Sequence, residues 1–171
     1  MSIWQPNEYK KNIFEINYNK LKKQNIKYLI YDLDNTIGLI DEDVCRGEIS
    51  DFLNTLSKDF TILIASNNNK NRVELFTKNI KCKYIFYALK PTRRLYWYIK
   101  KYYTKNMNEV TIIGDQLVTD ILVGNRFNMH TILVDPLAKK DLKITKLNRI
   151  IESFAMKRIK FKKGDYYEKK I

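Results

Sequence analysis

Hydrophobic residues in the central part of the chain occur as short, unbroken runs. Five runs rich in β-branched and aromatic residues recur along it, at positions 28–31, 60–64, 84–87, 110–113 and 131–134. Continuous runs of this length are typical of strands that are buried on both faces of a parallel sheet. The pattern therefore predicts five core strands, with connections that cross the faces of the sheet.

Amphipathic helices are predicted in the gaps between these runs. Apolar residues at i, i+3, i+4 and i+7 start at Ile49 and again at Leu95, after Pro91. Residues 69–80 carry apolar side chains at helical spacing, with Asn69 placed as an N-cap. Strands that alternate with helices predict an α/β fold, a Rossmann-like doubly wound parallel sheet.

Composition narrows the class of protein. The 171 residues suit one domain, and a 44% hydrophobic content is enough for a sizeable core. Two cysteines, Cys45 and Cys82, exclude a disulfide scaffold and favour a reduced, cytoplasmic protein. The longest apolar runs, such as residues 62–65, are far too short to span a bilayer.

The net charge of +13 is unevenly distributed. Residues 1–28 hold six Lys and two Glu, and residues 139–171 hold twelve Lys or Arg and four acidic residues. The remaining 29–138 hold fourteen basic and thirteen acidic residues, so the basic excess lies at the two ends. A protein that coats nucleic acid through a uniformly basic fold would not show this distribution.

Polar residues follow four of the predicted strands. Ligands of doubly wound sheets bind at the carboxyl ends of the strands, so these residues are the candidate site. They are Asp32, Asp34 and Thr36 after the first strand, Ser66, Asn67 and Asn68 after the second, Lys90 after the third, and Asp115 and Asp120 after the fourth. Each signal alone is weak, because an Asp-x-Asp or a Gly-Asp is often only a turn. Their order along one sheet carries the prediction.

Clustered carboxylates raise each other's pKa and are stabilised by a cation. Oxygen ligands without His or Cys favour a hard ion, Mg²⁺ before Ca²⁺ or Mn²⁺, and Mg²⁺ often shares its shell with a phosphate. The Lys90 ammonium and the Ser66 hydroxyl would then face phosphoryl oxygens. The combination predicts a site for phosphoryl transfer.

The same residues carry a resemblance to a known superfamily. Asp32-Leu33-Asp34-Asn35-Thr36, Ser66, Lys90 and Gly114-Asp115 followed by Asp120 resemble the four motifs of the haloacid dehalogenase (HAD) phosphohydrolases. Ser66-Asn67-Asn68, Ala88-Leu89-Lys90-Pro91, Gly114-Asp115-Gln116 and Thr145…Asn148-Arg149…Glu152 resemble the YqeG-type branch. That branch is similar to the mitochondrial and plastid phosphatases that act on phosphatidylglycerophosphate.

The resemblance implies a role for each matched residue. Asp32 would be the nucleophile that forms an aspartyl phosphate, and Asp34 the general acid and base. Mg²⁺ would lie between the Asp32 carboxylate, the Asp34 backbone carbonyl and Asp115, with Asp120 bound directly or through water. The remaining implied contacts are Ser66 and Lys90 on the phosphoryl oxygens, Asn67 and Asn68 beside the substrate, Thr36 bracing the Asp34 loop, and Arg149 reaching a second phosphate.

Spacing along the chain leaves no room for a cap domain. The intervals 34–66 and 66–90 are each used up by one helix and one strand. We therefore expect a single domain over 1–171, with a basic N-terminal segment (1–27), a catalytic core (28–138) and a basic C-terminal helix and tail (139–171). An open site favours a lipid, polymer or protein substrate over a small free metabolite.

Two basic regions admit two interpretations each. Residues 145–161 form an amphipathic pattern that fits either a helix on an anionic membrane or a helix packed on the sheet with a solvated lysine face. Arg93, Trp97 and Lys101 share one side of a predicted helix, which suits a membrane interface or is simply one surface Trp. His130, at the start of the fifth strand, is expected to be structural.

Three functions remain open, in this order. The first is a Mg²⁺-dependent phosphatase that acts on phosphatidylglycerophosphate, with an anionic phospholipid head group as partner and peripheral membrane contact. The second is the same enzyme class acting on a soluble sugar or nucleotide ester. The third, a nucleic-acid end-phosphatase or binding module, is disfavoured because no nucleic-acid module is found and the centre is nearly neutral.

Overall fold

The computed structural model describes residues 2–138, 154, 158–159 and 161–169. The helix predicted from residue 145 and the predicted phosphate contact Arg149 fall outside the described residues, except for a few positions near the end of that helix. The description that follows concerns the described residues only.

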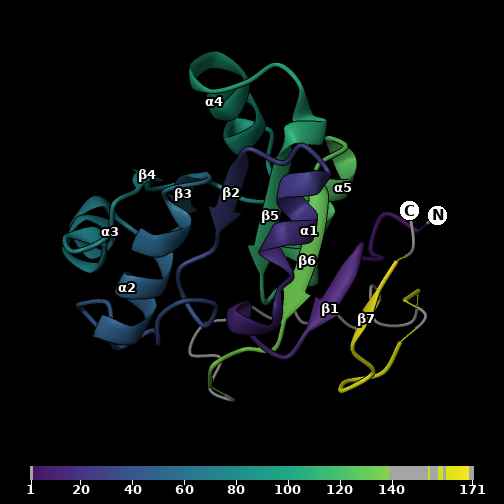
Figure 1. The fold of residues 1–171 in the computed structure, drawn as a ribbon, viewed down its shortest axis with the longest axis horizontal. Coiled ribbons are helices and arrows are strands. Elements are labelled where there is room, and N and C mark those ends of the chain that lie inside the picture. Colours follow the sequence, from purple (N-terminus) through teal and green to yellow (C-terminus); the bar gives the residue numbers. More distant parts are fainter. Residues whose placement is uncertain (1, 139–153, 155–157, 160, 170–171) are drawn as a thin grey trace.

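A seven-stranded sheet forms the centre of the molecule (Figure 1). Its strands are β1 (Glu8–Lys10), β2 (Tyr28–Tyr31), β3 (Thr61–Ala65), β4 (Lys83–Ile85), β5 (Val110–Gly114), β6 (His130–Val134) and β7 (Tyr167–Glu168). Their order across the sheet is β4-β3-β2-β5-β6-β1-β7. All neighbours pair in parallel except β7, which is antiparallel to β1.

Helices lie on both faces of the sheet. They are η1 (Ile13–Glu15), α1 (Tyr18–Lys23), α2 (Gly47–Leu56), α3 (Lys70–Thr77), α4 (Arg94–Tyr102), η2 (Met107–Glu109), the π-helical η3 (Leu117–Ile121) and α5 (Leu122–Arg126). Buried residues of α1, α2 and α3 pack with Leu29 and Tyr31 of β2, whereas those of α4 and α5 pack with Ile30. Because successive side chains of a strand point to opposite faces, the two helix layers lie on opposite sides of the sheet.

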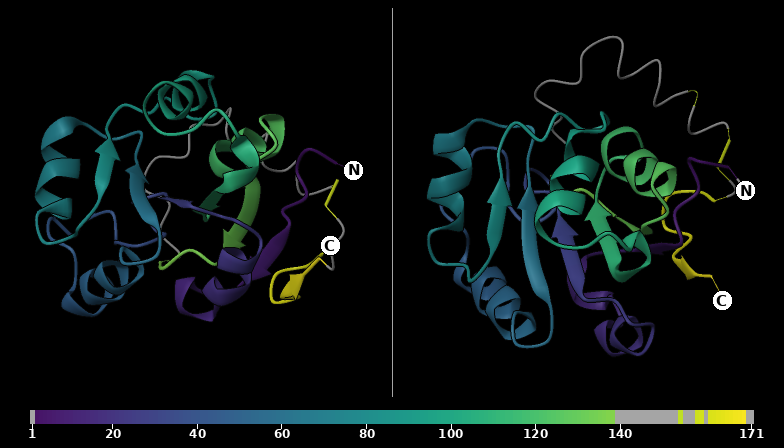
Figure 2. Two further views of the ribbon diagram at one scale, coloured as in Figure 1. Left: turned by 45° about the horizontal axis from the view of Figure 1, so that its top comes forward. Right: turned by 90° about the horizontal axis from the view of Figure 1, so that it is seen from above.

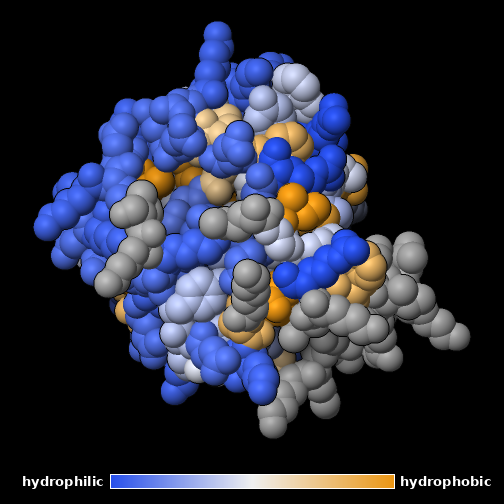
Figure 3. Space-filling model, turned by 90° about the vertical axis from the view of Figure 1, so that its right-hand side faces the viewer, coloured by the Kyte–Doolittle hydropathy of each residue, from blue (hydrophilic) through white to orange (hydrophobic). Residues whose placement is uncertain are grey.

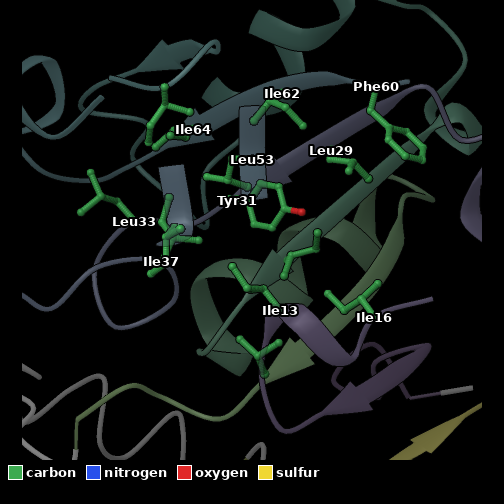
Figure 4. Packing of buried hydrophobic residues seen from close by; sticks show 14 of the residues in the cluster. Ile13, Ile16, Leu29, Tyr31, Leu33, Ile37, Leu53, Phe60, Ile62 and Ile64 are labelled. Carbon is green, nitrogen blue, oxygen red and sulfur yellow. The ribbon is translucent and has the colours of Figure 1, made fainter. Parts of the chain in front are cut away.

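The largest of the three hydrophobic clusters among the described residues lies under α1, α2 and α3 (Figure 4). Leu29, Tyr31 and Ile64 are inaccessible to solvent there, and the Tyr31 hydroxyl donates to the Tyr18 hydroxyl at 2.9 Å. Each fully buried aliphatic side chain stabilises the fold by about 1.5–3 kcal/mol relative to exposure. The continuous apolar runs of the sequence are therefore explained by burial on both faces.

The predicted architecture is confirmed, with one correction to the strand count. All five predicted core strands are present, and Asn69 caps α3 by accepting from the Arg72 N–H at 3.0 Å. Two strands were not predicted: β1 pairs with β6, and β7 extends the same edge. The N-terminal segment is thus part of the sheet. Strands of three and two residues are too short to produce a hydrophobic pattern of their own.

The interpretation of His130 as structural agrees with its contacts. Its Nε2 lies 3.2 Å from Oε1 of Glu8, a side chain of β1 that is 1% exposed. Lys10 and Lys20 each approach that carboxylate at 3.7 Å and also contact Glu168 of β7. The cluster joins β1, β6, β7 and α1 at the far edge of the sheet from β4.

The order of the strands reverses between β2 and β5. From β2 the chain proceeds through β3 to β4 on one side, and from β5 it proceeds to β6 on the other. In Figure 2 the arrowheads of the parallel strands point the same way, so the carboxyl ends of these strands lie along one side of the sheet. Connections that diverge from adjacent strands leave a crevice at this edge, where doubly wound proteins bind their ligands.

No cap domain is inserted beside this crevice. The interval from Asp34 to Ser66 contains a loop, α2 and β3, and the interval from Ser66 to Lys90 contains α3 and β4. Both intervals are described completely, so the predicted absence of a cap within them is confirmed.

Hydrophobic surface on the side of β1 and β7 occurs as small patches between hydrophilic residues (Figure 3). Among the described residues, no helix has both the length and the apolar character needed to cross a membrane.

Candidate active site

The loop after β2 is a tight turn that begins with Asp32. The Asp32 N–H donates to the Ile113 carbonyl at 2.9 Å, which keeps the residue aligned with the sheet. The Leu33 carbonyl accepts from the N–H groups of residues 36, 37 and 38. Asn35 has a φ of 65°, a conformation that Asn tolerates better than most residues. This turn fixes the Asp32 side chain at the end of β2.

The segment after β5 brings a second carboxylate to the same place. Both Asp120 and Ile121 donate through their N–H groups to the Gln116 carbonyl, and the bond from Ile121 has the wider five-residue spacing of a π-helical turn. The turn carries Asp120 back against Gly114, where a Cβ would lie 2.3 Å from the Asp120 carboxyl group. Gly114 is therefore required by the close approach of this carboxylate.

Lys90 joins the two carboxylates. Its Nζ lies 2.6 Å from Oδ1 of Asp32 and 2.7 Å from Oδ1 of Asp120, and its side chain is 1% exposed. Burial alone would lower the pKa of this ammonium, but Asp120 and Asp32 together hold the pKa above its ordinary value. Lys90 is thus a fixed positive charge in the site.

Three carboxylates surround this charge. Asp32, Asp115 and Asp120 each offer an oxygen within 4.8 Å of the others. Burial raises the pKa of Asp32 to about 7; Lys90 opposes the rise, and Asp120 adds to it. Burial, together with the Asp32 and Asp120 charges, also holds the pKa of Asp115 well above its ordinary value. One ammonium does not balance three carboxylates.

The donor set fits a hard divalent cation. Three converging carboxylates offer oxygen ligands alone, which is the preference of Mg²⁺. Burial first, and then the neighbouring carboxylates, raise the pKa values of Asp32 and Asp115, and a bound cation would favour their ionised forms. The three carboxylates therefore suit a divalent cation.

Thr36 connects the two motifs that carry the carboxylates. Its hydroxyl donates to Oδ1 of Asp115 at 3.2 Å. The resemblance implies that Thr36 braces the Asp34 loop; in the structure its hydroxyl ties this loop to Asp115. The hydroxyl fixes one carboxylate oxygen and leaves the other available.

The segment after β3 positions Lys90 and the Asp34 loop. Ser66 is buried, and its Oγ accepts from the Asn68 N–H at 3.0 Å. The Asn67 side chain makes two hydrogen bonds with the Lys90 backbone. It accepts from the Lys90 N–H at 2.8 Å and donates to the Lys90 carbonyl at 2.9 Å. Asn68 donates to Oδ2 of Asp34 at 3.4 Å. Both amides thus organise the site, and their contact with a substrate stays a prediction.

The Asp34 carboxylate is not a member of the three-carboxylate cluster and has partners of its own. Its Oδ1 accepts from Nη2 of Arg72 at 3.0 Å. The predicted metal contact of Asp34 was through its backbone carbonyl, so this placement leaves that prediction standing. The carboxylate itself is held separately, as a residue that exchanges protons with a substrate would be.

Sequence reasoning missed Arg72. Its guanidinium is largely buried, bonds Asp34, and donates to the backbone carbonyls of Leu39 at 2.8 Å and of Glu42. The available signal was its place three residues after the N-cap Asn69, in the first turn of a helix that begins at the predicted site. An arginine there projects toward the same edge of the sheet.

The fold and the site together define a class of protein. A doubly wound sheet without a cap, with Asp32, Lys90 and the Asp115–Asp120 turn at its switch point, is a HAD-superfamily phosphatase, a phosphoric monoester hydrolase. Within that class, the chain belongs to the family described as mitochondrial PGP phosphatase, whose model matches residues 3–138.

Individual relatives agree with this assignment. The chain is 37% identical over 158 residues to a probable phosphatase YqeG of Bacillus subtilis (strain 168), covering 92% of both proteins. A predicted HAD-like family hydrolase from Porphyromonas gingivalis superimposes with a TM-score of 0.54 at 12% identity, over 74% of this chain and 98% of that one. An uncharacterized protein from Listeria monocytogenes serotype 4b gives 0.54 at 13% identity, over 71% and 87%. The two solved structures support the fold alone.

Proposed function

We propose that the protein is a Mg²⁺-dependent phosphatase that hydrolyses phosphatidylglycerophosphate through an aspartyl-phosphate intermediate on Asp32. The observation that carries the proposal is the Asp32 carboxylate, fixed at the end of β2 and paired at 2.6 Å with the buried Lys90. The family description supports the substrate class, and the YqeG relative supports phosphatase activity.

In the first step, an Asp32 oxygen attacks the phosphorus and the bond from phosphorus to the ester oxygen breaks. The leaving alkoxide takes a proton from the Asp34 carboxyl group. Lys90 and Ser66 hold the oxygens of the transferring phosphoryl group, where negative charge develops. The products of this step are the free alcohol and phosphorylated Asp32.

In the second step, water attacks the phosphorus of the intermediate and Asp34 takes its proton. The bond between the phosphorus and the Asp32 oxygen breaks, which releases phosphate and restores both aspartates. Arg72 and Asn68 hold the Asp34 carboxylate in one orientation for both proton transfers.

Magnesium would be held by the carboxylates of Asp32, Asp115 and Asp120 together with the Asp34 backbone carbonyl. When bound, the ion neutralises the phosphoryl oxygens and orients them for an in-line displacement. Removal of divalent ions with EDTA should abolish phosphate release, and Mg²⁺ should restore it.

The absence of a cap in the intervals 34–66 and 66–90 supports a large substrate. An open edge admits a phosphate group that projects from a bilayer, whereas a capped site encloses small metabolites. The predicted contact of Arg149 with a second phosphate, and membrane association through residues 145–161, belong to the same proposal.

The test is phosphate release from phosphatidylglycerophosphate in vesicles. The wild-type protein should hydrolyse it, Asp32→Asn should not, and Asp41→Asn, which removes an exposed carboxylate from the same loop, should retain activity. Equal efficiency on soluble sugar phosphates and nucleotides would favour the soluble-ester alternative. Wild-type release no greater than that of Asp32→Asn would contradict the enzyme assignment itself.

A further inference from the structure

Two bulky side chains next to the site are exposed to solvent, and their residues have a left-handed backbone conformation. Tyr87 is 48% exposed with a φ of 45°, and Leu89 is 49% exposed with a φ of 52°. This left-handed conformation favours Gly or Asn and is costly for large side chains. Strained residues of this kind concentrate at functional sites. Neither exposure nor backbone conformation explains why Tyr and Leu occupy these positions.

The segment that carries these two residues is hydrogen-bonded to the backbone of active-site residues. The Tyr87 N–H donates to the Asn68 carbonyl and the Ala88 N–H to the Ser66 carbonyl, both at 2.9 Å. Leu89 directly precedes Lys90, whose backbone is held by Asn67. Whatever contacts Tyr87 and Leu89 is therefore held in a fixed relation to the catalytic aspartates.

A shallow apolar groove lies beside this segment, between the edge strand β4 and α4. Its volume is about 340 Å³, and it is lined by Tyr84, Ile85, Phe86, Arg94, Trp97, Tyr98 and Lys101. Trp97 is 55% exposed, with the ammonium of Lys100 5.3 Å from its ring centroid. The groove thus combines an amphipathic ring with positive charges, the combination found at membrane interfaces.

The stretch of sequence that contains β4 and α4, the two elements lining the groove, carries only basic charges. Between Glu74 and Glu109 the sequence contains no acidic residue and nine basic ones: Lys78, Lys81, Lys83, Lys90, Arg93, Arg94, Lys100, Lys101 and Lys105. The nearly neutral total for the centre of the chain therefore conceals a strongly basic segment. Lys90 is buried in the active site, and the other eight side chains reach the surface, where they are complementary to an anionic partner.

We propose that Tyr87, Leu89 and Trp97, with Arg93, Arg94 and Lys101 around them, form a docking surface for an anionic phospholipid bilayer. The surface would hold the active-site edge of the sheet against the lipid head groups. Docking itself requires no catalysis, so the proposal rests on the proposed function only for the purpose that docking would serve.

The exposed apolar side chains favour a bilayer over a nucleic acid. A basic surface with aromatic residues can also bind single-stranded nucleic acid by stacking. Leu89 cannot stack on a base, and its aliphatic side chain gains free energy only where apolar surface covers it. A bilayer accommodates Leu89 and Trp97 in its interface while its anionic head groups contact the arginines and lysines.

Trp97 provides a direct signal for docking. The sequence has two tryptophans, and Trp4 is buried, so a change of surroundings on lipid binding is reported by Trp97. Vesicles of phosphatidylcholine that contain about 30–40 mol% phosphatidylglycerol provide the anionic surface that attracts basic segments. The fluorescence maximum should move to shorter wavelength with these vesicles and stay unchanged with phosphatidylcholine alone. A Trp97→Phe variant should lose the shift.

Substitutions separate the apolar and the charged contributions. Leu89→Asn removes the aliphatic side chain and suits the left-handed backbone, so it should melt no lower than wild type while sedimenting less with anionic vesicles. Arg94→Gln with Lys101→Gln should weaken binding about 25-fold, since each basic residue near an anionic surface strengthens it about fivefold. Matched controls are Leu75→Gln, which alters a side chain 46% exposed on α3, and Lys23→Gln with Lys58→Gln, which alter exposed lysines of the α1–α2 layer. These controls should bind like wild type.

The vesicles contain no phosphatidylglycerophosphate, so the binding experiment tests the docking surface independently of catalysis. If the wild-type protein shows the Trp97 fluorescence shift but has no phosphatase activity, only the proposed function is overturned. Wild-type protein that ignores anionic vesicles, or binding that Leu89→Asn and Trp97→Phe leave unchanged, would overturn the docking surface. Tight binding to single-stranded RNA that depends on Arg94 and Lys101 but not on Leu89 would replace it with a nucleic-acid surface.

Discussion

Replacing Lys90 by methionine tests how the charges of the active site are balanced. Methionine keeps much of the side-chain volume and removes the ammonium that lies 2.6 Å from Asp32 and 2.7 Å from Asp120. Both carboxylates then remain in the interior, where Asp120 is inaccessible to solvent. A buried charge that loses its partner is strongly destabilising, because nothing offsets its desolvation.

The expected loss is about 3–5 kcal/mol of unfolding free energy, the cost of breaking a buried ion pair from one side. The loss should grow with pH. Lys90 opposes the burial that raises the pKa of Asp32 to about 7, so without Lys90 the carboxyl group takes up a proton at low pH and relieves the imbalance. Each pH unit over which Asp32 must be ionised adds about 1.4 kcal/mol.

Urea unfolding of the metal-free protein at pH 6 and pH 8 measures this loss. The double variant Lys90→Met with Asp32→Asn should be more stable than Lys90→Met at pH 8, by about 1.5 kcal/mol or more, because the cycle isolates the interaction of the two side chains. The reasoning is refuted if Lys90→Met unfolds within about 1 kcal/mol of wild type at pH 8. Equal loss at both pH values would refute the assignment of the imbalance to a titrating carboxylate.

Three further changes have defined outcomes. Gly114→Ala places a methyl group against the Asp120 carboxyl group, so calorimetric melting should show a loss of about 1–3 kcal/mol and Mg²⁺ should no longer raise the melting temperature. Arg72→Lys should slow the first step, alcohol release with phosphorylation of Asp32, at least about tenfold for alkyl phosphates and much less for the 4-nitrophenol burst from 4-nitrophenyl phosphate, because a good leaving group needs no proton from Asp34 in that step; equal slowing of this step for both would contradict the positioning role. Metal-free wild type should melt lower at pH 8 than at pH 5, because a folded-state pKa near 7 makes Asp32 hold its proton more tightly than the unfolded chain does; Asp32→Asn should weaken this dependence, and a rise in melting temperature with pH would contradict it.

The fold was predictable because burial leaves a direct trace in residue type. Strands β2, β3 and β5 are covered on both faces, so nearly all of their positions are apolar, Thr61 and Thr111 excepted, and the run stands out. Strand β1, which lies between β6 and the edge strand β7, has no such trace, since three residues with Glu8 in the centre of an ion-pair cluster do not form an apolar run. Strand β7 adds only two residues from the far end of the chain.

The candidate site was predictable to the extent that it follows from strand ends. Asp32 and Asp115 come directly after or beside the ends of paired strands, so the parallel register brings them together. Asp120 depends on the π-helical turn, whose width no hydrophobic pattern predicts. Arg72 binds backbone carbonyls of the 39–42 loop, and contacts to backbone groups are not encoded in the residue types of their partners.

The central claim is that Asp32 carries the phosphoryl group during hydrolysis. The most direct measurement is to quench the Asp34→Asn variant during turnover of 4-nitrophenyl phosphate, a substrate whose leaving group needs no proton while hydrolysis of the intermediate still needs the missing base. Borohydride reduction then converts an aspartyl phosphate to homoserine, and peptide mass spectrometry locates it. We predict homoserine at position 32, and none when Asp32 is also replaced by Asn. Phosphate release without modification at position 32, or modification at another residue, would contradict the account.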